Sequence, residues 1–118
     1  MAVFVIDITR TRGDDKRMTF TVKDSEGALV PINAWTLFVM AVHSVEDPVD
    51  DTTLVYSMAG VFTTDGTDSK IYFKPTTLQA DDTAPEVYYY DAQALDANGE
   101  KCTFVRGSYT INQDRTKD

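Results

Sequence analysis

The sequence predicts an all-β fold, an immunoglobulin-like antiparallel β-sandwich of about seven to eight strands. Short apolar or β-branched segments recur along the chain, and turn residues separate them roughly every 8–12 residues. No stretch has the length and periodicity of a long helix. The 118 residues fit one domain, residues 1–118, with a flexible C-terminal tail over about 113–118.

The N-terminal third reads as strands joined by turns. Residues 2–9 are apolar and β-branched and predict a strand, and residues 12–15 predict a turn. Residues 17–23 alternate apolar and polar side chains, as a half-buried strand does. Asp, Ser, Glu and Gly at 24–27 fit a type I turn closed by a left-handed glycine, and 28–30 allow a short strand.

The middle of the chain contains the most apolar segment. Residues 34–42 are apolar almost throughout and predict a central strand. Residues 44–52 form an acidic loop, and an apolar stretch follows at 53–62. A turn at 65–66 precedes a further strand at 69–74.

The C-terminal part predicts a hairpin. Prolines bracket residues 76–84 and leave room for a turn or two of helix at most. Residues 86–95 then pair with 100–111, and Gly99 takes the left-handed position of a three-residue loop.

The expected hairpin register sets small residues against apolar ones. It places Ala94 opposite Cys102 and Ala92 opposite Phe104, both pairs facing inward. Residues 106–107 then predict a bulge, after which the inward face resumes.

Two features favour the immunoglobulin-like kind of sandwich. Residues 82–84 followed by Tyr88 match a tyrosine corner, in which a phenol bonds to backbone upstream. Trp35 heads the third long strand, where those folds place a core tryptophan. The single Cys102 excludes an intrachain disulfide, so packing must hold the layers together.

The charge of the chain is negative and unevenly distributed. Eleven bases and nineteen acids give a net charge of −8, which disfavours nucleic acid as a partner. Residues 24–100 carry almost all of the excess acid, and both ends are basic. We expect no membrane partner, because no apolar run is long enough to span a bilayer.

The apolar strand at 34–42 supplies the candidate interface. A strand with one solvated face should alternate, yet this one carries apolar side chains on both. We expect either another subunit or the chain's own loops to cover one face. The candidate interface residues are Phe38, Met40, Val42 and, from a run of three tyrosines, Tyr89.

The residues predict no catalytic site, metal site or cofactor. His43 and Ser44 are neighbours on a strand and face opposite sides, so they cannot share a proton. The paired carboxylates lie in loops, where solvation is the expected state. Whether calcium binds between Asp50, Asp51, Asp81 and Asp82 is left open, because their spacing matches no calcium loop.

Several segments, in order, resemble the N-terminal domain of phage baseplate upper proteins and related tail modules. The segments are 8–14, 20–24 with Gly27, 56–57, 65–66, 71–73, 88–93 and 104–111, which together span nearly the whole chain. Most of these positions are turns or core residues, so they specify a fold more clearly than a function.

That resemblance implies a non-enzymatic virion protein. It would be an adaptor or attachment module of the tail or baseplate, assembled in the host cytoplasm, with other phage proteins and copies of itself as partners. The alternatives are a phage head decoration protein and a carbohydrate-binding or adhesion module that recognises a host surface glycan through Tyr89.

Overall fold

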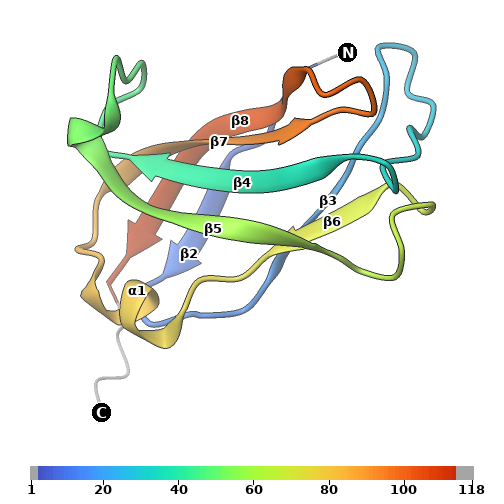
Figure 1. The fold of residues 1–118 in the computed structure, drawn as a ribbon. Helices are drawn as coiled ribbons and strands as arrows, with labels where there is room; N and C mark the ends of the chain where they lie inside the picture. The colour runs from blue at the N-terminus through green and yellow to red at the C-terminus, as the bar shows by residue number, and fades with distance from the viewer. Residues whose placement is uncertain (1–2, 114–118) are drawn as a thin grey trace.

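The computed structural model describes residues 3–113, so Asn112 and Gln113 are the last described residues, and the tail expected over about 113–118 lies almost wholly outside them. Its strands join into one eight-stranded sheet that curls into two packed layers, as Figure 1 shows. The elements in chain order are β1 (Phe4–Val5), β2 (Ile8–Thr11), β3 (Met18–Thr21), β4 (Thr36–His43), the 3₁₀ turn η1 (Asp51–Thr53), β5 (Leu54–Phe62), β6 (Lys70–Phe73), α1 (Thr77–Asp82), β7 (Val87–Leu95) and β8 (Lys101–Asn112). The all-β sandwich is confirmed.

Strand β5 belongs to both layers. It pairs with β4 as far as Ala59 and with β6 from Gly60 onward. A Cβ at Gly60 would lie 2.5 Å from the Cβ of Phe38, so only glycine lets the strand cross here. One layer thus contains β8, β7, β4 and the start of β5, and the other contains the end of β5, β6 and β3.

The N-terminal strands close the sandwich at one side. Both β1 and β2 run parallel to β8, whereas the other strand pairs within residues 3–113 are antiparallel. The strand expected at 2–9 is interrupted at Ile6 and Asp7, between β1 and β2. The amide of Ile6 still donates to the carbonyl of Arg106 at 2.9 Å, so the chain stays attached to β8 through the break.

Aromatic side chains from both layers meet in the core. Phe20 from β3 packs on Phe73 at 6.0 Å and on Tyr90 of the opposite layer at 6.1 Å between ring centroids. The hydroxyl of Tyr56 donates to that of Tyr109 at 2.9 Å, which satisfies both polar groups inside the core. The alternation expected at 17–23 is confirmed, since its apolar side chains are buried.

The two immunoglobulin-like features are present. The Tyr88 hydroxyl donates to the carbonyl of Ala84 at 2.7 Å and forms the tyrosine corner. Trp35 is buried against Phe38 and Phe104, at 6.3 and 6.4 Å between ring centroids.

The short helix α1 lies where the prolines leave room for it. Thr76 accepts a hydrogen bond from the Gln79 amide at 3.1 Å, and the Gln79 side chain accepts one from the Thr76 amide at 2.9 Å. This capping box satisfies two amide donors that a six-residue helix would otherwise leave free. No helix in the part of the chain that the structure describes is long and apolar enough to cross a membrane.

The C-terminal hairpin differs from its expected register at one point. Gly99 has a φ of 77° and closes the loop as expected, and Ala94 faces Cys102. Ala92, however, faces Val105 and not Phe104, because the extra residue lies at Phe104. The bulge expected at 106–107 was therefore misplaced. Its actual position lets both Phe104 and Val105 point into the core.

A second bulge reverses the facing of β4 at its start. Leu37 has a φ of 55°, a left-handed value that is uncommon outside glycine, and the β4–β7 register shifts there. As a result Trp35 and Phe38 both point inward, although they are three residues apart. Leu37 itself points out, with 71% of its surface exposed.

The expected interface on β4 was assigned to the wrong side of the strand. Phe38, Met40 and Val42 are 7%, 0% and 0% exposed and pack in the protein's own core. The opposite layer covers these side chains, so they cannot contact another molecule. The exposed apolar side chains of β4 are Leu37 and Val39.

Candidate functional site

The candidate site is the solvent-facing side of the β8–β7–β4–β5 layer, which we call the outer face. Because side chains alternate along a strand, every second residue of these strands points out. Strand pairing aligns them in rows, such as Thr103–Gln93–Val39–Ala59 and Arg106–Asp91–Ala41–Ser57. The row beyond the second contains Ser108, Tyr89 and His43, and the row before the first contains Lys101, Leu95 and Thr36.

One half of the outer face is an apolar groove of about 300 Å³. Leu37 and Val39 supply most of its exposed apolar surface, at 71% and 41% exposure. The residues that line it are Leu37, Val39, Ala41, Asp91, Gln93, Ala94, Leu95 and Lys101. Contiguous apolar surface of this kind marks a contact site more often than isolated apolar residues do.

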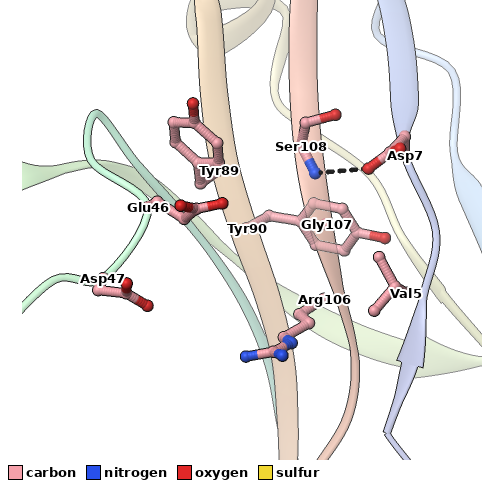
Figure 2. Close-up of a pocket in the computed structure, with 9 residues that line it drawn as sticks. All are labelled: Val5, Asp7, Glu46, Asp47, Tyr89, Tyr90, Arg106, Gly107 and Ser108. Atoms are coloured by element: carbon pink, nitrogen blue, oxygen red, sulfur yellow. Dashed lines mark hydrogen bonds between the residues drawn. The ribbon is translucent and has the colours of Figure 1, made fainter.

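The other half is a polar hollow of about 520 Å³ (Figure 2). The loop that follows β4 forms one wall with Glu46 and Asp47, next to Tyr89. Val5 at the end of β1 and Asp7 in the link between β1 and β2 form the opposite wall. The outward residues of β8, Arg106 and Ser108, border the hollow between these walls.

The wall next to β8 is held by two hydrogen bonds and one close approach of the backbone. A carboxylate oxygen of Asp7 accepts a hydrogen bond from the Ser108 amide at 3.0 Å. This bond lowers the pKa of Asp7, so its carboxylate is charged at neutral pH. The carbonyl of Ile6 accepts a bond from the Tyr90 hydroxyl at 2.6 Å. A Cβ on Gly107 would come within 2.2 Å of that carbonyl oxygen, so the close approach requires glycine.

The hollow is acidic. Asp7, Glu46 and Asp47 contribute three carboxylates against the single guanidinium of Arg106. Within residues 3–113, Glu46, Asp47 and Arg106 form no ion pair. The half-buried ring of Tyr89 lies beside these carboxylates. Carboxylates and an aromatic face together favour a cationic group.

The groove and the hollow form one continuous surface. A third depression of about 230 Å³ lies between them, under the loop that follows β4. It shares Glu46, Asp47, Tyr89 and Arg106 with the hollow and Asp91 with the groove. A single partner could therefore contact both halves at once.

The remaining candidates from the sequence differ in where they lie. Tyr89, a candidate interface residue, lines the hollow and is half-buried, and its partner stays a prediction. The Nδ1 atom of His43 lies 3.1 Å from the Thr53 hydroxyl, and Asp50 accepts a bond from the Thr52 amide at 2.9 Å. Within residues 3–113, no three His, Cys, Asp or Glu side chains are gathered as a metal site would need. The side chain of Asp81, named above as a calcium candidate, lies outside the described residues.

Sequence reasoning missed Leu37, Arg106 and Asp7. Leu37 lies two residues after Trp35, so simple alternation would point both side chains to the same side, and the left-handed backbone that turns Leu37 outward has no local signal. Asp7 reaches the hollow only because β1 and β2 pair with β8, a contact across about a hundred residues of chain.

No protein-family model and no curated protein matches this chain. Among solved structures it is similar to that of CopC from Methylosinus trichosporium OB3b. The likeness covers 95% of this chain and 89% of that chain, with a TM-score of 0.49 and 8% sequence identity.

These findings correct the expected function. The expected assignment to a phage tail, baseplate or head is withdrawn: no family model and no curated protein matches the chain, and the solved structure named above is that of CopC. The segments that carried the resemblance are mostly turns and core positions, which unrelated β-sandwiches share. The resemblance itself is untested, and the virion location that depended on the phage assignment is not proposed again.

Proposed function

We propose that this chain is a non-enzymatic domain that associates with copies of itself through the outer face. The observation that carries the proposal is the backbone conformation and the exposure of Leu37. This residue adopts a left-handed backbone in which glycine would be less strained, and it projects an apolar side chain into solvent. Strain of this kind clusters at functional sites, because the side chain is retained for what it contacts.

The size of the outer face suits a weak, reversible dimer. Four strands about 4.8 Å apart and four rows about 6.6 Å apart give roughly 500 Å² per copy. This is below the roughly 800 Å² per partner of a standard stable interface. We therefore expect association in concentrated rather than dilute solution.

Sedimentation velocity of the wild type and two variants tests the proposal. Leu37→Gly removes the apolar side chain and keeps the left-handed backbone, so the fold should be as stable as in the wild type. Leu78→Lys is the matched control, because Leu78 is equally exposed, at 69%, but lies on α1. We expect the wild type and Leu78→Lys to associate as concentration rises, and Leu37→Gly to stay monomeric.

Two results would refute the proposal. The first is a wild-type protein that sediments as a monomer even at millimolar concentration. The second is a Leu37→Gly protein that associates as strongly as the Leu78→Lys control.

A further inference from the structure

We infer that two copies pack outer face to outer face with their β4 strands crossing antiparallel, so that Lys101 of each copy enters the acidic hollow of the other. The inference rests on the proposed self-association and adds its geometry.

In the proposed dimer, the twofold axis runs perpendicular to the strands, in the plane of contact, and passes between the row of Val39 and the row of Ala41. The row of Val39 in one copy therefore lies against the row of Ala41 in the other. Val39 of one copy then meets Ala41 of the other, and Gln93 meets Asp91, an amide donor against a carboxylate. On β8, the hydroxyl of Thr103 meets the Arg106 guanidinium. In these two central rows, an aliphatic side chain on β4 thus faces another, and a donor faces an acceptor on β7 and on β8.

The same axis places the ends of the face together. Lys101 and Ser108 are the outward β8 residues of the first and last rows, roughly 20 Å apart along the strand. After the twofold rotation, Lys101 of one copy lies over Ser108 of the other. The hollow there has the carboxylates of Asp7, Glu46 and Asp47, which have no cation except Arg106 nearby. Lys101 is exposed and forms no ion pair within residues 3–113.

In the alternative face-to-face dimer, the twofold axis runs along the strands. The contacting side chains of the two copies are then less complementary. This arrangement would set Lys101 over the end of β5 near Val61, where the outward side chains are apolar. It would place Asp91 over Ala41. It would also bring the two acidic loops that follow β4 to the same end, where like charges repel. Two twisted sheets that pack face to face cross at about 30°, an angle that the central rows tolerate.

Charge reversal in two separate variants tests this geometry. Lys101→Glu places a carboxylate against an acidic hollow, and the double variant Glu46→Lys with Asp47→Lys places lysines against Lys101. Each variant alone should associate roughly tenfold more weakly than the wild type or worse. An equimolar mixture should regain wild-type affinity, because both ends of the mixed dimer then pair opposite charges. Lys70→Glu is the control, since Lys70 is exposed on β6 in the other layer.

The outcomes separate this inference from the proposed function. Restored association in the mixture, measured by sedimentation with one variant fluorescently labelled, supports the antiparallel arrangement. Association of Lys101→Glu equal to that of Lys70→Glu, or no recovery on mixing, overturns it. If Leu37→Gly still abolishes association in that case, the outer face remains the contact and only the geometry is wrong. A wild-type protein that stays monomeric would refute both the proposed self-association and this geometry.

Discussion

Four tyrosine hydroxyls of the core, those of Tyr56, Tyr88, Tyr90 and Tyr109, each have a defined partner. Tyr88 donates to the Ala84 carbonyl, Tyr90 to the Ile6 carbonyl, and Tyr56 to Tyr109. Because a hydroxyl left unpaired inside a core is destabilising, these bonds fix how the connections near β7 and β1 dock. A phenol must stay protonated to donate in this way.

Alkaline pH should therefore destabilise the fold. Burial raises the pKa of Tyr88 from 10.0 to about 12, with a smaller contribution from Glu86, and burial also raises the pKa values of Tyr56, Tyr90 and Tyr109. Groups with a raised folded-state pKa stabilise the fold fully below pH 10, and this stabilisation is lost as pH rises toward 12. Urea denaturation at stepped pH should show the free energy of unfolding falling through that range.

A Tyr88→Phe variant is the internal comparison for this prediction. It should lose about 1 kcal/mol at neutral pH, because the Ala84 carbonyl loses its donor. Its free energy of unfolding should also fall less steeply above pH 10, since one titrating group is gone. A free energy of unfolding that is flat from pH 10 to 12 in both proteins would contradict the role given to these phenols.

Among the elements, the link between β1 and β2 depends on one residue of β8. The Ile6 carbonyl approaches Gly107 so closely that a Cβ there would lie 2.2 Å from its oxygen. The same link supplies Asp7 to the wall of the hollow. A glycine in β8 is therefore a requirement of the site as well as of the fold.

Gly107→Ala should displace this link. We expect a loss of about 1–3 kcal/mol in the free energy of unfolding, as overpacking produces. Hydrogen exchange should show faster exchange at the Ile6 amide, whose bond to Arg106 would lengthen. The Ala84→Gly variant, at an exposed position, provides a baseline for small side-chain changes. Unchanged stability and unchanged protection of Ile6 would show that the link adapts freely.

Local signals predicted most of the elements, and contacts between layers decided the rest. The alternation around Phe20, the prolines around α1 and the glycine of the last hairpin each specify their structure within a few residues. The bulges at Leu37 and Phe104 follow from how Trp35, Phe38 and Val105 share the core, which no local pattern encodes. The outer face was missed for this reason, because one left-handed residue reverses which side of β4 is exposed.

At the scale of the whole molecule, net charge opposes the association that the outer face favours. Each copy has a charge of −8, so two copies repel at long range. Much of the acid lies in the loops and turns between strands, away from the centre of the outer face. We expect contact to be weak and to depend on correct orientation, with the apolar side chains of β4 supplying attraction and Lys101 supplying specificity.

A dilution series followed by amide chemical shifts tests the central claim most directly. If copies associate through the outer face, shifts that change with concentration will map to its central rows, at Val39, Ala41, Asp91, Gln93 and Arg106. Amides of β3 and β6 in the other layer will stay constant. Shifts that do not change with concentration, or changes confined to β3 and β6, would contradict the account.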